Sequence, residues 1–89
     1  TIFLGQAGNR AIHGFGLAAQ FYFDRDLENL HPSQLAMLVG MIPAPSTYNP
    51  FRNVERATQR RDLVLRSLKQ SGYITAGELE LYTQAPLGL

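Results

Sequence analysis

The stretch PAPSTYNPFRN, residues 43–53, separates two segments of very different composition. The segment before it, QLAMLVGMI (residues 34–42), is almost entirely apolar, and the segment after it, VERATQRRDLVLRSLKQ (residues 54–70), is rich in arginine. Pro43 and Pro45 lack a backbone N–H and push the preceding residue out of the α region, so they end a helix that reaches them. Because the Ser, Asn and remaining Pro residues of the stretch favour turns, it predicts a tight corner between two helices.

The apolar segment before the corner predicts a buried helix. Pro32 suits the first turn of a helix, where its missing N–H needs no partner, and His31 stands at the expected helix start. Every residue from 35 to 42 is apolar except Gly40. A helix that is apolar on all sides is typical of the centre of a domain, so we expect this one to be central and buried.

The corner and the helix after it carry clear local signals. Tyr48 and Phe51 are apolar anchors, and we expect both to be largely buried so that they fix the turn to the body of the domain. Asn53 is a good N-cap for the following helix. Glu55 in the first turn and Lys69 near the end complement the helix dipole.

Two further helices are predicted. Residues 14–23 carry apolar side chains at i, i+3, i+4 and i+7, which form one helical face. Gly72 suits the left-handed residue that ends many helices. Thr75 and Glu78 have the capping-box spacing T-x-x-E, which predicts a helix over residues 76–85. The fold class is therefore all-α, with about four helices and no convincing strand.

Arg61 is the unusual residue of the arginine-rich helix. Helical spacing places it on the apolar stripe, between Ala57 and Val64. A guanidinium there must bind a carboxylate or backbone carbonyls, or reach solvent. We expect a structural arginine that binds carbonyls of a neighbouring loop, such as the corner, or an acidic side chain; phosphate binding is the alternative. Arg60 lies on another face, and we expect Arg60→Lys to be nearly silent.

Composition limits the classes of function. The chain has 89 residues, 45% hydrophobic and 17% charged, with a formal net charge of +1, which is typical of one small domain or a piece of a larger one. It has no cysteine, so disulfide and cysteine–zinc frameworks are excluded. No apolar run approaches the ~20 residues of a membrane helix. The start, TIFLGQ, lacks an initiator Met, and we interpret the chain as a segment of a longer protein.

Six of the eight Lys and Arg residues lie between Arg52 and Lys69. A helix with this many basic side chains can bind the phosphate groups of a nucleic acid backbone. We instead expect a solvated helix face supported by an Asp62–Arg66 pair at i, i+4.

Catalytic and metal-binding signals are weak. His13 and His31 are the only histidines, and no Cys or second His lies at metal-ligand spacing, so no metal ligand is predicted. Asp24, Asp26 and Glu28 alternate along a connector. Paired carboxylates can perform glycosyl chemistry only when they flank a sugar in a cleft, so we expect an exposed acidic connector.

A longer set of motifs resembles a known enzyme family. The segments TIFLGQAGNRAIHGFGLAAQFYF (1–23), LHPSQLAMLVGMIPAPSTYNPFRNVERATQRRDLVLRSLKQSGYIT (30–75) and APLGL (85–89) are similar to the C-terminal part of the family 51 glycosyltransferase domain. This is the peptidoglycan glycosyltransferase of bifunctional class A penicillin-binding proteins. The resemblance implies that residues 1–89 form the C-terminal portion of a lysozyme-like, all-α lobe.

The resemblance also implies a function for the parent enzyme. It would polymerise lipid II into glycan strands at the periplasmic or extracytoplasmic face of the bacterial inner membrane, with membrane association supplied by segments outside this chain. Its partners would be lipid II, the growing glycan strand and the rest of the glycosyltransferase domain, and not nucleic acid. A divalent metal, Mg or Mn, is implied for the parent, and none is evident in this chain. The family's two glutamate motifs are absent from these 89 residues, so no catalytic residue is assigned and the chain alone is expected to be inactive.

Substrate-binding residues are implied only near the start of the chain. Phe3, Gln6, Gly8 and Asn9 match the family segment that approaches the substrate cleft. Asp24 departs from the family, which usually continues Y-F-G at this point.

A rival hypothesis is a non-enzymatic helical module. Its arginine-rich helix would bind a protein partner or nucleic acid. The near-neutral net charge and the arginine on the apolar stripe count against DNA.

Overall fold

The computed structural model describes residues 14–89, and this part is helical. The elements are a helix over residues 14–23, the 3₁₀ turn η1 (Leu27–Asn29), α2 (Pro32–Met41), α3 (Val54–Gln70) and α4 (Ala76–Gln84). Four α-helices and no strand are present among the described residues, so the predicted all-α class is confirmed. The chain divides into two compact units, and the second is His31–Gly88.

The helix over residues 14–23 ends in a left-handed residue. Asp24 has φ +52°, and its N–H donates to the carbonyl of Gln20 at 3.0 Å. This is a position that glycine fills without strain and that Asp tolerates better than most residues. Asp24 thus adopts a conformation that glycine, the residue usual in the family at this position, would favour.

His31 caps the N-terminus of α2, as predicted. Its Nδ1 accepts a hydrogen bond from the Ser33 N–H at 3.2 Å, and the Gln34 side chain accepts one from the His31 N–H at 3.0 Å. The two bonds satisfy two backbone donors that an uncapped helix leaves open. Pro32 occupies the first helical position.

The predicted burial of α2 is confirmed for seven of its ten residues, but burial on all sides is wrong. One side is buried, but Leu35, Val39 and Ile42 are 41%, 36% and 57% exposed. These residues lie at i, i+4 and i+7 and form one exposed stripe. Within the unit His31–Gly88, α3 and α4 pack against α2 but do not surround it.

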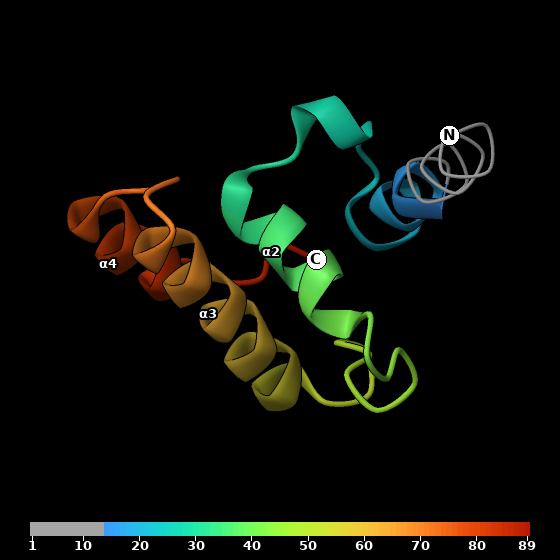
Figure 1. Cartoon of the computed structure of the whole chain (residues 1–89). Helices are drawn as coiled ribbons and strands as arrows, with labels where there is room; N and C mark the ends of the chain where they lie inside the picture. Colours follow the sequence, from blue (N-terminus) through green and yellow to red (C-terminus); the bar gives the residue numbers. More distant parts are fainter. Residues whose placement is uncertain (1–13) are drawn as a thin grey trace, which may run out of the picture. The chain divides into compact units, whose positions relative to one another are not determined.

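Gly40 lets α3 approach α2 closely. A Cβ atom at this position would lie 3.1 Å from the backbone carbon and oxygen of Arg60. Figure 1 shows α3 running beside α2, with α4 alongside the C-terminal part of α3.

The corner is anchored differently from the prediction. Phe51 is 58% exposed, which contradicts its expected burial, and Tyr48 is half-buried. Pro50 is fully buried instead. The Asn49 side chain accepts a hydrogen bond from the Phe51 N–H at 2.9 Å, and this local turn leaves the ring of Phe51 outside.

The caps of α3 and α4 are confirmed. The Asn53 side chain accepts from the Arg56 N–H at 3.0 Å, and Gly72 follows α3 with φ +84°. In α4, the Thr75 hydroxyl accepts from the Glu78 N–H at 3.0 Å, and the Glu78 carboxylate accepts from the Thr75 N–H at 2.9 Å.

We predict that Gly40→Ala lowers the free energy of unfolding by about 1–3 kcal/mol, because the added methyl group forces α2 and α3 apart. Gly77→Ala is the matched control, since its Cβ would meet only the Thr75 hydroxyl at 3.9 Å. This control should be neutral or stabilising by up to about 1 kcal/mol. Urea unfolding measures both variants, and equal effects would contradict the close approach at Gly40.

Candidate functional site

The residues predicted to contact substrate lie outside the described residues. These are Phe3, Gln6, Gly8 and Asn9. His13 also lies outside the described residues. The predictions about them therefore stay predictions. The described residues show how the helices of the lobe are held together, which positions any site built on them.

Arg61 is a buried clamp between α3 and α4. Its side chain is 1% exposed. Nη1 donates to the carbonyl of Ala85 at 2.6 Å, Nη2 donates to that of Thr83 at 3.0 Å, and Nε donates to the Asp62 carboxylate at 3.0 Å. The predicted structural role, with carbonyls and an acidic side chain as acceptors, is confirmed.

We had expected Arg61 to bind carbonyls of a neighbouring loop such as the corner, but the carbonyls that it binds lie elsewhere. They belong to the C-terminal end of α4, where the last carbonyls of a helix have no intrahelical partners. A cation is also favoured at this end by the helix dipole. Arg61 therefore acts as a C-terminal cap supplied by another helix.

Arg60 points the other way, towards α2. Its Nε donates to the carbonyl of Gly40 at 3.1 Å, and its guanidinium carbon lies 5.0 Å from the centre of the Tyr48 ring. These contacts argue against the sequence-based prediction that Arg60→Lys is nearly silent. The expected Asp62–Arg66 pair is also replaced, because Asp62 forms its ion pair with Arg61 at 3.0 Å.

We predict that Arg61→Lys lowers the free energy of unfolding by about 2–3 kcal/mol, because one ammonium group cannot reach both carbonyls and the carboxylate. Arg60→Lys should cost about 1 kcal/mol through the lost carbonyl and ring contacts. The control is Arg66→Lys, at an exposed position of the same helix, which should change stability by less than about 0.5 kcal/mol. Thermal and urea unfolding measure all three, and an Arg61→Lys protein as stable as the control would refute the clamp.

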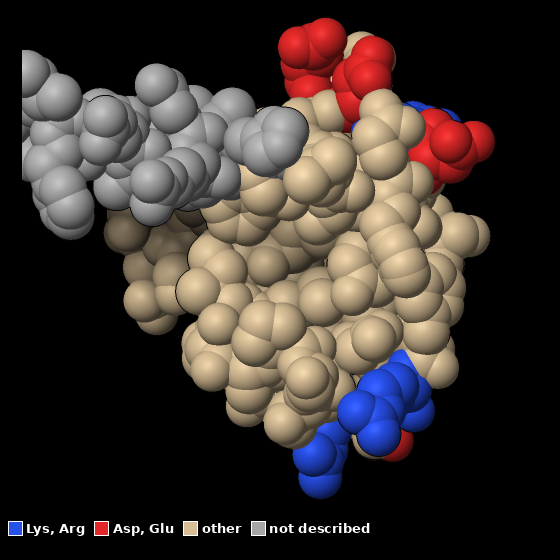
Figure 2. Space-filling view, turned by 90° about the vertical axis from the view of Figure 1, so that its right-hand side faces the viewer, with Lys and Arg blue, Asp and Glu red and all other residues tan. Residues whose placement is uncertain are grey.

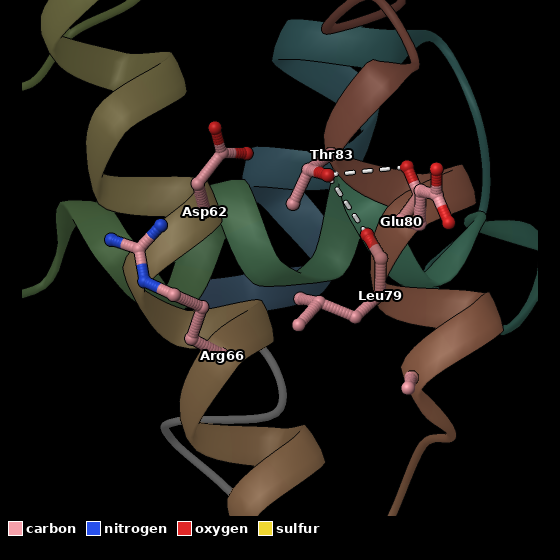
Figure 3. A pocket seen from close by; sticks show the side chains of 6 residues that line it. Asp62, Arg66, Leu79, Glu80 and Thr83 are labelled. Atoms are coloured by element: carbon pink, nitrogen blue, oxygen red, sulfur yellow. Dashed lines mark hydrogen bonds between the residues drawn. The ribbon is translucent and has the colours of Figure 1, made fainter.

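An open groove of about 460 Å³ lies between α3 and α4. Figure 3 shows Asp62 and Arg66 on the α3 wall and Leu79, Glu80 and Thr83 on the α4 wall. The Thr83 hydroxyl donates to the carbonyl of Leu79 at 2.9 Å, and Asp62 is paired with Arg61, so neither group is poised for chemistry. No cluster of three or more metal-ligating side chains is present among residues 14–89. The groove therefore has neither the nucleophile–base pair nor the ligand set of a catalytic centre.

Tyr82 joins α4 to the start of α2. Its ring meets that of His31 edge-on, with centroids 4.9 Å apart, and its hydroxyl donates to the Glu78 carboxylate at 3.1 Å. The Thr75 backbone N–H, and then the Tyr82 hydroxyl, lower the pKa of Glu78 below its usual value. The same hydrogen bond raises the pKa of Tyr82, because the donor has to keep its proton.

The lowered pKa of Glu78 predicts a pH dependence of stability. The stabilisation is present above the pKa that this carboxyl has in the unfolded chain, and it is lost as the pH falls through the lower folded pKa. Unfolding by urea, measured from about pH 7 to about pH 3, should therefore show a loss that Glu78→Gln lacks. Glu80→Gln, outside the capping box, is the control. A Glu78→Gln protein with the same pH profile as the parent would contradict the assignment.

Comparison with known proteins places the chain in a family. The family model described as Transglycosylase matches residues 1–69. The chain belongs to the transglycosylase family. It is 50% identical over 86 residues to penicillin-binding protein 1B of Vibrio cholerae, 47% identical over 88 residues to that of Haemophilus influenzae, and 44% identical over 88 residues to that of Escherichia coli. The family resemblance inferred from the motifs is confirmed.

These matches cover 97%, 99% and 99% of the chain, but only 11%, 11% and 10% of the respective relatives. The chain thus spans about a tenth of the length of the curated relatives it matches. Its helices are those of a portion of the lysozyme-like transglycosylase domain.

Proposed function

We propose that this chain is the C-terminal portion of a peptidoglycan glycosyltransferase domain that polymerises lipid II into glycan strands. The observation that carries the proposal is the transglycosylase match over residues 1–69. The two glutamate motifs expected for this chemistry are absent from the 89 residues. We therefore assign this portion a scaffolding and substrate-contacting role, and not that of general base.

Within this proposal, Phe3, Gln6, Gly8 and Asn9 contact the substrate, and the helices after them form the frame. Departure of a diphosphate from lipid II needs positioned cations. Arg60 and Arg61 are not proposed for that role, because their guanidinium groups bind backbone carbonyls inside the frame. An Mg or Mn ion is proposed for the complete enzyme only, and no cluster of three or more His, Asp or Glu side chains is present among residues 14–89.

The rest of the glycosyltransferase domain is the proposed neighbour of the exposed stripe on α2. This helix carries no charged side chain, although Leu35, Val39 and Ile42 are exposed. On the face drawn in Figure 2 the Lys, Arg, Asp and Glu side chains gather at the upper and lower edges, and the stripe on α2 is itself built from uncharged residues. An uncharged surface of this kind is typical of a face that another element covers.

We propose the extracytoplasmic face of the bacterial inner membrane as the location, where lipid II and the growing strand are the substrates. None of the helices described in residues 14–89 is long and apolar enough to cross a membrane.

The rival function, a helical module that binds a protein or nucleic acid through the arginine-rich helix, has no support from the comparisons. The rival function also requires the basic side chains of α3 to be available to a partner. Two of the basic side chains of this helix, those of Arg60 and Arg61, are engaged in internal contacts.

We predict that the complete gene product assembles lipid II into glycan strands, which a polyacrylamide gel detects. The 89-residue chain alone should make none, because the general base is missing. In the complete gene product, Gln6→Ala and Asn9→Ala should each slow polymerisation by about tenfold or more. The control is Gln59→Ala, at an exposed position of α3, which should leave the rate unchanged.

Two results would contradict the proposal. A complete gene product that binds lipid II but makes no polymer would refute the activity. Polymer made by the 89-residue chain alone would refute the view that the essential glutamates lie elsewhere.

A further inference from the structure

The last part of the described fold lies beyond the family match. The match ends at residue 69, inside α3, and α4 with the tail at residues 85–88 follows. We infer that residues 76–88 form a latch, which closes on α2 and α3 as a unit and opens without unfolding them. Arg61 is the positioning residue that holds this latch. The inference stands independently of the proposed function.

Apolar packing contributes little to the latch helix. None of the nine residues of α4, all of them in the described part of the chain, is fully buried. Leu81 is 64% exposed. An isolated helix of this length is unstable in water, so α4 exists only through its contacts with the rest of the fold.

These contacts are few, and most lie at the end of α4 and in the tail. Arg61 binds the carbonyls of Thr83 and Ala85, and Leu87 is 6% exposed. Figure 1 shows the tail returning to α2, where the chain ends.

Gly88 completes the closure against α2. Its φ is +79°, and a Cβ atom on it would lie 2.9 Å from Nε2 of Gln34. The positive φ favours glycine here, whereas the end of the Gln34 side chain is flexible and can move aside, so this second contact of the tail is weaker than that of Arg61.

The opening of the latch exposes polar groups and the side chain of Leu87, whereas separation of α2 and α3 exposes the larger apolar core. The buried apolar side chains of this core are Ala36, Met37, Leu38, Met41, Ala57 and Leu65. In the open latch, water reaches both the guanidinium and the freed carbonyls, so no buried polar group is left without a partner. Local opening of the latch therefore needs less free energy than global unfolding.

Hydrogen exchange of the complete gene product, followed by mass spectrometry, tests the inference. Peptides from residues 76–88 should exchange faster than those from α2 and the first half of α3. Arg61→Lys should raise exchange in the latch by about tenfold or more, because the latch loses charged hydrogen bonds, and should leave unchanged those α2 amides that exchange through small local fluctuations. The control variant Arg66→Lys should change neither.

Gly88→Ala is the second variant, in case Arg61→Lys does not fold. An alanine is strained at the φ of +79° of this position, so the variant should also raise exchange in residues 76–88 alone. Equal increases in all helices, or global unfolding of both variants, would overturn the inference, because α4 would then be an inseparable part of the core. Unchanged exchange in both variants would also overturn it, because the latch would then not depend on these contacts.

Discussion

Two consecutive arginines on α3 hold the described helices together, and they do so in opposite directions. Successive residues of a helix are turned by about 100° around its axis, so neighbours can face different elements. Arg60 reaches the carbonyl of Gly40 on α2, and Arg61 reaches the last carbonyls of α4. Each arginine thus ties a neighbouring helix to α3, and α2 also packs on α3 through the apolar core.

The burial of Arg61 is tolerated because its donors are satisfied. A buried guanidinium loses its hydration, and the loss is offset only when hydrogen bonds replace it. Nε, Nη1 and Nη2 each have an acceptor, and no buried side-chain nitrogen or oxygen among residues 14–89 lacks a partner. Because every donor of this guanidinium is paired, the removal of one partner leaves a buried group unpaired and destabilises the fold. An arginine is therefore required at this position for its shape as much as for its charge.

Local chemistry predicted the helices well, because caps and prolines act within a few residues. The Asn53 cap, the Thr75–Glu78 box and the left-handed Gly72 are all present. Arg61 was predictable as well, since helical spacing alone puts it on the packing face. The family was recognised from ordered motifs, yet the substrate residues implied at the start of the chain lie outside the described residues, so their geometry remains a prediction.

Tertiary effects account for the errors. The partner of Arg60 is twenty residues away in the sequence, and only the fold brings Gly40 to it. Pro50 is buried in place of Phe51 because the turn at Asn49 sets the direction of the chain. The exposed stripe of α2 shows a further limit, because the apolar composition of a helix does not reveal how many of its sides this chain itself covers.

The central claim is that Arg61 is a fixed, hydrogen-bonded clamp. Nuclear magnetic resonance of the arginine side chains tests it most directly, because restricted rotation separates the Nη proton signals and hydrogen bonds slow their exchange with water. The account predicts separate, slowly exchanging Nη signals for Arg61, with scalar couplings to the carbonyl carbons of Thr83 and Ala85, and averaged signals for Arg66. An averaged, rapidly exchanging guanidinium at Arg61 would contradict it.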